Sequence, residues 1–215
     1  MNFFSPELQR YVENHTSPES ALLKRLDRET NLRALYPKMI SGHLQGRILA
    51  MFSQMIKPQR ILEIGTFTGY SAICMAEGLV EGGELITIDI NHELQDMVQQ
   101  YFLEAGISSS VKCVLGDAME VIPTLQGTFD LVYLDADKEN YCNYLDLIIE
   151  KVAPGGYILA DNVLWYGKVL ESIPKKLDRE TMAIKEFNKK VIDDPRVENV
   201  LLPVRDGLML IRKNI

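Results

Sequence analysis

The chain has 215 residues, 47% hydrophobic and 25% charged, with a formal net charge of −7. This length and composition predict one globular domain and exclude a disordered, collagenous or coiled-coil chain. The acidic balance makes nucleic acid an unlikely partner, although a local basic patch stays open. No signal peptide or membrane span is expected. Cys74, Cys113 and Cys142 lie in apolar segments and are interpreted as buried thiols of a cytoplasmic protein.

The N-terminal part, residues 1–58, is predicted to form a helical cap. Ser5 and Ser17 are each followed by proline and glutamate, a sequence that favours the first turn of a helix. A further helix is predicted from Gly42 to Ile56, because apolar residues recur there on one helical face.

From residue 59 onward, short apolar runs alternate with amphipathic stretches. The runs predict strands at 60–64, 84–89, 111–115, 129–135, 157–160, 197–202 and 208–212. The stretches predict helices near 70–80, 92–105, 117–125, 140–152 and 178–193. Strands joined through helices form a parallel sheet covered on both faces. The last two strands are joined by few residues, so they pair as an antiparallel hairpin or lie close together.

The predicted fold is therefore α/β. It is a Rossmann-like, doubly wound sheet of seven mostly parallel strands, with one antiparallel strand and extra N-terminal helices. The core at 59–215 and the helical cap are expected to form a single domain. Ligands of such a sheet bind beyond the carboxyl ends of its strands, so the residues that follow each strand are the candidates for function.

The first strand is followed by EIGTFTGYS at 63–71. Its glycines allow a tight turn and a close approach of the backbone to a ligand. Phe67 stands where the dinucleotide motif G-x-G-x-x-G has its second glycine, which argues against a pyrophosphate. Glu63 suits a cationic ligand. An ordinary turn between a strand and a helix is the alternative interpretation.

Acidic residues also follow the second and third strands. Asp89 stands about 20 residues beyond the glycine turn, a position suited to hydrogen bonds with ribose hydroxyls. The alternative is a helix cap, a role that Asn91 is also placed to fill. Asp117 is interpreted either as the cap of the next helix or as part of a loop beside an adenine ring.

Three oxygen-bearing side chains follow the fourth and fifth strands, namely Asp135, Asp161 and Asn162. If these strands are neighbours, the three side chains converge at one edge of the sheet. An all-oxygen ligand set favours a hard cation such as Mg²⁺, Mn²⁺ or Ca²⁺. The alternative is that each residue caps a helix or turn.

Lys138 follows the first of these acids by three residues. Beside a divalent cation and partly buried, it would have a lowered pKa and could act as a general base. The alternative is a surface salt bridge with Asp137 or Glu139. No G-x-S-x-G motif occurs and no histidine has a partner at triad spacing, so covalent acyl chemistry is not expected.

Four motifs together resemble the cation-dependent O-methyltransferases, the family of the caffeoyl-coenzyme A and catechol O-methyltransferases. They are EIGTFTGYS at 63–71, FDLVYLDADK at 129–138, GGYILADNVLW at 155–165 and LPVRDGL at 202–208. The resemblance extends over nearly the whole chain, from about Met39 to Arg212. It implies transfer of a methyl group from S-adenosylmethionine to a hydroxyl of a small catechol-like or phenolic acceptor.

The resemblance also implies residue roles. Asp135, Asp161 and Asn162 would hold the metal, and Lys138 would be the general base, with Asp135 beside it in the catalytic set. Asp89 would hold the ribose. The implied cofactor residues are Met39, Ser41, Glu63, Gly65, Thr66, Phe67, Tyr70, Ser71, Asp89, Ala118 and Asp135.

Partners are less closely defined. The loop at 165–177 and the N-terminal helices, which cover the acceptor in this family, show no pattern that selects one acceptor. Methylation of a hydroxyuridine in transfer RNA is therefore an alternative, and an inactive cofactor-binding relative is another. The resemblance and the apolar surface of the N-terminal helices both indicate a homodimer.

Overall fold

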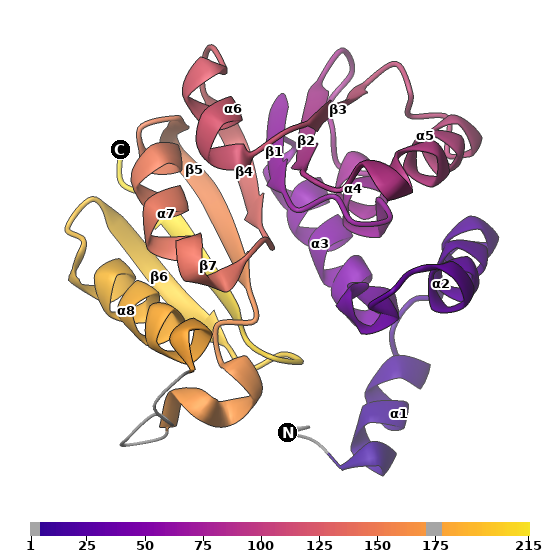
Figure 1. Ribbon diagram of the computed structural model, residues 1–215, viewed down its shortest axis with the longest axis horizontal. Helices are drawn as coiled ribbons and strands as arrows, with labels where there is room; N and C mark the ends of the chain where they lie inside the picture. The colour runs from indigo at the N-terminus through magenta and orange to yellow at the C-terminus, as the bar shows by residue number, and fades with distance from the viewer. Residues whose placement is uncertain (1–4, 171–177) are drawn as a thin grey trace.

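The computed structural model describes residues 5–170 and 178–215, and Figure 1 shows a central sheet with helices on both faces. The elements, with η for short 3₁₀ helices, are α1 Pro6–Asn14, α2 Ala21–Arg33, η1 Pro37–Met39, α3 Gly42–Ile56, β1 Arg60–Ile64, α4 Tyr70–Ala76, β2 Glu84–Asp89, η2 His92–Leu94, α5 Gln95–Glu104, β3 Val111–Leu115, α6 Ala118–Thr124, β4 Phe129–Leu134, η3 Lys138–Asn140, α7 Tyr141–Ile149, β5 Val152–Asp161, η4 Trp165–Leu170, α8 Arg179–Asp193, β6 Val197–Leu202 and β7 Leu208–Lys213. Part of the predicted acceptor loop, residues 171–177, lies outside the described residues.

The seven strands form one sheet in the order β3-β2-β1-β4-β5-β7-β6. β7 runs antiparallel to both β5 and β6, and the other neighbouring strands pair in parallel. The predicted sheet, mostly parallel with one antiparallel strand, is confirmed. β4 and β5 are neighbours, with Leu134 opposite Ala160. The next residues along the chain, Asp135 and Asp161, therefore come to the same edge of the sheet.

Two apolar cores cover the sheet. On one face, Leu131 and Tyr133 of β4 pack with helices α2 to α5, and on the other Val132 and Leu134 pack with α6 to α8. Successive side chains of a strand point to opposite faces, and all four of these side chains are fully buried. A strand buried on both faces explains the uninterrupted apolar run in the sequence.

The N-terminal helices confirm two of the three predicted starts. Ser5 caps α1, with its Oγ accepting from the Leu8 amide at 3.2 Å, and α3 has the predicted bounds. The predicted start at Ser17 is wrong, because Ser20 caps α2 instead. The Ser17 carbonyl accepts a hydrogen bond from the His43 ring at 2.7 Å, which ties this segment to α3. A helical cap at 1–58 within a single domain stays a prediction.

β5 is longer than predicted, since it begins at Val152 rather than at 157. Pro154 and two glycines lie within this longer strand, and the pairing with β4 continues past them through a register shift between Phe129 and Leu131. Such a bulge accommodates a proline and glycines without ending the strand.

The three cysteines carry free thiols, but only Cys74 is buried; Cys113 and Cys142 are half-buried. Cys113 lies on β3, which is an edge strand of the sheet formed by the described residues. Within the described parts of the chain, no helix is long and apolar enough to cross a membrane. A cytoplasmic location stays a prediction.

The winding of the sheet reverses between β1 and β4, because the chain passes from β1 to β2 and β3 on one side before it returns to β4. The backbones beyond these strands nearly touch. The Asp135 amide donates to the Ile64 carbonyl at 2.9 Å, and a Cβ on Gly65 would lie 2.0 Å from the Asp135 carbonyl oxygen. Gly65 also has a φ of 104°, which other residues rarely adopt. The turn at the expected ligand crevice thus requires glycine.

Candidate active site

A cavity of about 310 Å³ opens beyond the carboxyl ends of β1, β2 and β3. Phe67, Val98 and Leu115 contribute apolar wall, and Asp89 contributes a carboxylate. An apolar slot with one acidic group at its side suits a flat heterocycle attached to a sugar. The cavity thus lies beyond the carboxyl ends of the strands, as expected for a doubly wound sheet, on the β2 and β3 side of the point where the winding reverses.

Asp89 ends β2 and faces this cavity. One carboxylate oxygen accepts from the Phe67 amide at 2.7 Å and the other from the Asn91 amide at 2.8 Å. The predicted alternative, a helix cap, is taken by Asn91, whose side chain accepts from the Glu93 amide at 2.9 Å. Each oxygen of Asp89 has a second lone pair that can accept a further hydrogen bond.

The turn between β1 and α4 contains three residues in the left-handed region. Gly65, Phe67 and Gly69 have φ values of 104°, 49° and 84°. A Cβ on Gly69 would lie 2.7 Å from the Phe102 ring. Thr66 is buried, and its hydroxyl lies 2.5 Å from that of Thr87. The turn therefore has a specific backbone conformation, with close contacts at Gly69 and at the Thr66 hydroxyl, rather than that of an ordinary link.

Glu63 is fully buried below this turn. Its carboxyl accepts from the hydroxyls of Ser71 and Thr87, both at 2.5 Å. Burial raises the pKa of Glu63 to about 8, although both hydrogen bonds oppose the shift. The side chain is thus mostly protonated at pH 7. Glu63 and Ser71, both predicted to hold the cofactor, contact one another, and their role toward the cofactor stays a prediction.

Other predicted cofactor residues lie in different surroundings. The Tyr70 hydroxyl donates to Glu19 at 2.6 Å, so this side chain turns toward the N-terminal helices. Ala118 is buried at the start of α6. Met39 ends η1 and is 59% exposed, whereas Ser41 is buried beside α3. None of these four residues is among those that line the cavity.

Asp117 takes the cap alternative, with its carboxylate accepting from the Met119 amide at 2.8 Å. This caps the first turn of α6.

Asp135 and Asp161 come together at the ends of β4 and β5. The Tyr133 hydroxyl lies 3.1 Å from Asp161 Oδ2 and 3.5 Å from Asp135 Oδ2, so it contacts both carboxylates. Burial and then the negative charge of Asp135 raise the pKa of Asp161. Asn162 follows with a φ of 60°, and its amide donates to Asp161 Oδ1 at 2.8 Å. The structure thus brings the side chains of Asp135 and Asp161 to one place, and the third predicted ligand, Asn162, follows Asp161 in the chain.

The side chains of Asp135, Asp161 and Asn162 offer oxygen atoms as metal ligands. Across residues 5–170 and 178–215, no group of three or more His, Cys, Asp or Glu side chains is arranged to hold a metal ion. Two carboxylates, one amide and water or substrate oxygens fit a hard divalent cation, which prefers oxygen ligands. They do not fit a soft metal that requires thiolate or imidazole.

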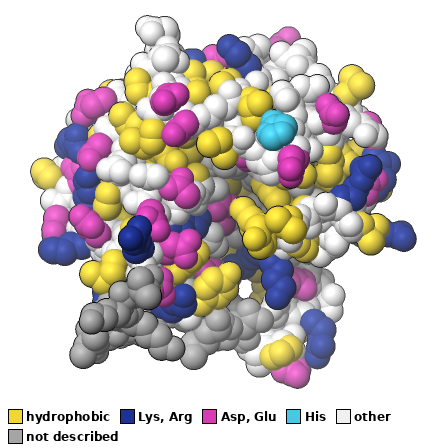
Figure 2. Space-filling view, in the orientation of Figure 1, with side chains coloured by type: hydrophobic (Ala, Val, Ile, Leu, Met, Phe, Trp, Pro, Cys, Tyr) yellow, Lys and Arg dark blue, Asp and Glu magenta, His cyan; other side chains and the backbone are white. Residues whose placement is uncertain are grey.

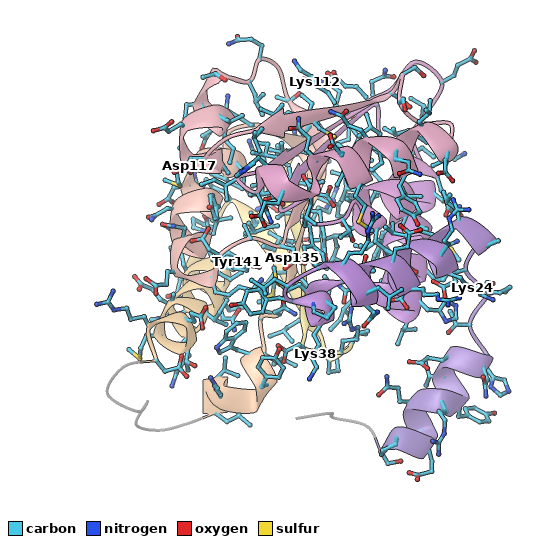
Figure 3. All side chains as sticks on the ribbon, turned by 45° about the vertical axis from the view of Figure 1, so that its right-hand side comes forward. Lys24, Lys38, Lys112, Asp117, Asp135 and Tyr141 are labelled. Atoms are coloured by element: carbon cyan, nitrogen blue, oxygen red, sulfur yellow. The ribbon has the colours of Figure 1, made fainter. Side chains whose placement is uncertain are left out.

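Lys138 begins η3 and is buried beside these acids. Its Nζ donates to Asp135 Oδ1 at 2.9 Å and to the Tyr141 hydroxyl at 2.5 Å; Figure 3 shows Asp135 and Tyr141 close together near the centre of the molecule. Burial lowers the pKa of Lys138, but the charge of Asp135 and the proximity of Tyr141 outweigh it, and the net pKa is raised. The alternative of a surface pairing with Asp137 or Glu139 is wrong, because η3 turns the side chain inward.

Three residues of the site were assigned no role in the sequence analysis, namely Gln45, Tyr141 and Arg205, although Arg205 lies in the motif LPVRDGL. Gln45 reaches the Asp161 carboxylate from α3, and Arg205 reaches Gln45 from the turn between β6 and β7. Tyr141 donates to the Asp161 carbonyl at 3.0 Å. Tyr133 could have been found from its position, since it precedes Asp135 by two residues and so points to the same face.

The chain matches a known protein family over most of its length. The family model described as O-methyltransferase matches residues 13–214. Caffeoyl-CoA O-methyltransferase 1 of Eucalyptus globulus is 34% identical over 95% of this chain and 87% of its own, and the Stellaria longipes enzyme of that type is 31% identical over 97% and 91%.

Solved methyltransferase structures are also similar to this chain. The SAH-bound methyltransferase PaMTH1 of Podospora anserina has a TM-score of 0.89 and 28% identity, and the match covers 100% of this chain and 99% of that chain. The O-methyltransferase TomG of Streptomyces achromogenes, in complex with SAM, has a TM-score of 0.87 and 26% identity over 97% and 96%.

Proposed function

The chain belongs to the O-methyltransferase family and is an S-adenosylmethionine-dependent enzyme, and on this premise we propose that it methylates one hydroxyl of a catechol-like acceptor with the help of a divalent cation. The observation that carries the proposal is the meeting of Asp135, Asp161 and Lys138 at one edge of the sheet. The Asp135 backbone lies beside Gly65, and the next two residues of that turn, Thr66 and Phe67, line the cavity that Asp89 faces.

The residues of the cavity would bind S-adenosylmethionine and orient it. Asp89 would accept hydrogen bonds from the ribose hydroxyls, and Phe67 and Leu115 would pack against the adenine. Glu63 and the backbone after β1 would hold the methionine part. S-adenosylmethionine supplies an electrophilic methyl group on a positively charged sulfur.

For the cation, Asp135, Asp161 and Asn162 would be the protein ligands. When bound, a divalent cation lowers the pKa of a coordinated hydroxyl and orients two adjacent acceptor oxygens. A pair of adjacent hydroxyls, as in a catechol, suits this arrangement better than a single one. The caffeoyl-CoA type of the relatives supports a phenolic acceptor.

Lys138 would take the proton of the reacting hydroxyl. Its raised pKa means that the side chain is an ammonium while it is paired with Asp135. Neutralisation of Asp135 by a cation would remove the main interaction that raises this pKa. Base catalysis by Lys138 and cation binding by Asp135 are therefore proposed to depend on one another.

The test uses radiolabelled S-adenosylmethionine and a panel of acceptors. We expect label in catechols, loss of transfer in excess chelator and recovery with Mg²⁺ or Mn²⁺. Phenols with a single hydroxyl are the matched control and should accept label poorly. Full activity in the presence of chelator would refute the cation requirement.

Transfer RNA is included in the same assay as a competing acceptor. Figure 2 shows acidic and basic side chains interspersed over the face in view, without a broad basic area, and the chain carries a net charge of −7. Both observations favour the small molecule. Label in RNA but not in catechols would replace this proposal with the RNA alternative.

The chain is further proposed to be a homodimer. Within its described residues α1 buries none of its side chains, and Tyr11 of α1 and Met51 and Met55 of α3 are exposed by 58–71%. Exposed apolar side chains on the helices of one part of a chain are typical of an interface. Light scattering at micromolar concentration should return twice the chain mass of 24.4 kDa, and a monomer mass would contradict the proposal.

A further inference from the structure

The phenol of Tyr133 occupies an unusual place for a tyrosine. It is the fifth residue of β4, fully buried on the face that α3 covers. Its hydroxyl lies between Asp161 and Asp135, at 3.1 and 3.5 Å. A hydroxyl has one proton to donate, and the shorter distance assigns that proton to Asp161.

Gln45 closes a triangle with these two groups. Its Nε2 lies 2.6 Å from Asp161 Oδ2 and 2.8 Å from the Tyr133 hydroxyl. The two hydrogens of the amide nitrogen thus serve the carboxylate and the phenol separately. Gln45 is 2% exposed, so water does not compete for these bonds.

Arg205 fixes which way the Gln45 amide points. Its guanidinium donates to Gln45 Oε1 at 3.0 Å, and also to the carbonyls of Ile40 and Ser41. Because arginine can only donate, the amide oxygen must face Arg205 and the nitrogen must face Asp161. Arg205 does this from a left-handed backbone with a φ of 50°.

The carboxylate of Asp161 is therefore held at both oxygens. Oδ2 accepts from Gln45 and Tyr133, and Oδ1 accepts from the Asn162 amide at 2.8 Å. These contacts come from α3, β4 and the end of β5, so three separate elements fix one side chain. Asp135 has no comparable set, since its short contact is with Lys138.

We propose that Tyr133 and Gln45 are positioning residues that hold the Asp161 carboxylate in one orientation and thereby set the affinity for a divalent cation. This inference rests on the cation site of the proposed function. A ligand that is already oriented loses less freedom on binding, and partners of metal ligands commonly change metal affinity when they are removed.

The experiment measures Mn²⁺ affinity on the full chain with SAH bound, from the electron paramagnetic resonance signal of free Mn²⁺. Tyr133→Phe and Gln45→Met should each weaken Mn²⁺ binding about tenfold. Tyr144→Phe is the matched control, because the Tyr144 hydroxyl bonds Asp137 at 2.6 Å rather than Asp161. It should bind Mn²⁺ as the wild type does.

The double variant separates positioning from a general structural effect. Either substitution breaks the set of hydrogen bonds that joins Gln45, Tyr133 and Asp161. The double variant Tyr133→Phe with Gln45→Met should therefore bind Mn²⁺ about as well as each single variant. Independent structural damage would instead multiply the two losses. SAH affinity should be unchanged throughout, because Asp89 and the glycine turn lie on other strands.

The Mn²⁺ and SAH affinities together distinguish failure of the positioning role from failure of the cation site. Wild-type Mn²⁺ affinity in Tyr133→Phe, with SAH binding intact, overturns the positioning role and leaves the cation site standing. Absence of Mn²⁺ binding by the wild-type chain overturns the cation site and the positioning role together. If Tyr133→Phe fails to bind SAH and so is misfolded, Gln45→Met decides by the same criterion.

Discussion

Replacing Glu63 with glutamine should change how the free energy of unfolding depends on pH, because the Glu63 carboxyl is buried. Burial raises the pKa of Glu63 from an ordinary value of 4.5 to about 8. The folded protein thus binds a proton more tightly than the unfolded chain does. Its contribution to stability is fully present below pH 4.5 and is lost as the pH rises to about 8.

The magnitude depends on the pH range that is measured. From pH 5.5 to pH 8 the loss is about 1.4 kcal/mol per pH unit, or roughly 3 kcal/mol. Glu63→Gln cannot ionise and lacks this loss. It retains one acceptor for Ser71, and the Thr87 hydroxyl can rotate to accept from the new amide. Relative to wild type, the variant should therefore gain about 3 kcal/mol of stability between pH 5.5 and pH 9.

Urea denaturation at pH 5.5, 7 and 9, without cofactor, measures this difference, because all other titrating groups are common to both proteins. Ser71→Ala provides a matched variant. It removes a hydrogen bond that lowers the Glu63 pKa, so its stability should continue to fall to a higher pH than in wild type. A stability difference between Glu63→Gln and wild type that stays constant with pH would refute the reasoning.

Three further changes test the rest of the site. Lys138→Met should lower the methylation rate about 10²- to 10⁴-fold while Mn²⁺ binding, measured by calorimetry, persists; a normal rate would remove Lys138 from the mechanism. Gly65→Ala should cost about 2–5 kcal/mol in urea denaturation, from its positive φ and the contact with Asp135, and a neutral result would contradict the described turn. Asp89→Ala should weaken S-adenosylmethionine binding by about 1.5–3 kcal/mol in calorimetry, whereas Asp117→Ala, the loss of a helix cap, should leave it unchanged.

Most of the fold could be predicted because local signals agree with it. The strand at 60–64 and the helix from Gly42 to Ile56 match the structure, since apolar periodicity and flanking turn residues indicate the same bounds. The failures are local signals that tertiary contacts override. At Ser17 the backbone bonds His43 rather than starting α2, and at Pro154 the neighbouring strand accommodates a bulge.

Some residues of the candidate site could likewise be predicted from the sequence, and others could not. Asp135 and Asp161 could be placed together because parallel neighbouring strands bring their carboxyl ends to one edge. The link from Arg205 through Gln45 to Asp161 spans 160 positions in its first step and 116 in its second. No spacing rule covers such distances. They depend on how α3 packs against the sheet and on the path of the final turn.

Asp135 is the residue that joins these observations. It pairs with Lys138 at 2.9 Å, and it is also a ligand in the proposed cation site. A single carboxylate cannot stabilise the ammonium form of Lys138 and give its full charge to a cation at the same time. Binding of a cation would thus free Lys138 to act as a base, and loss of the cation would return it to the ammonium form. Lys138 need not be a base on its own for the mechanism to hold. It follows that chelation and Lys138→Met should impair the same step.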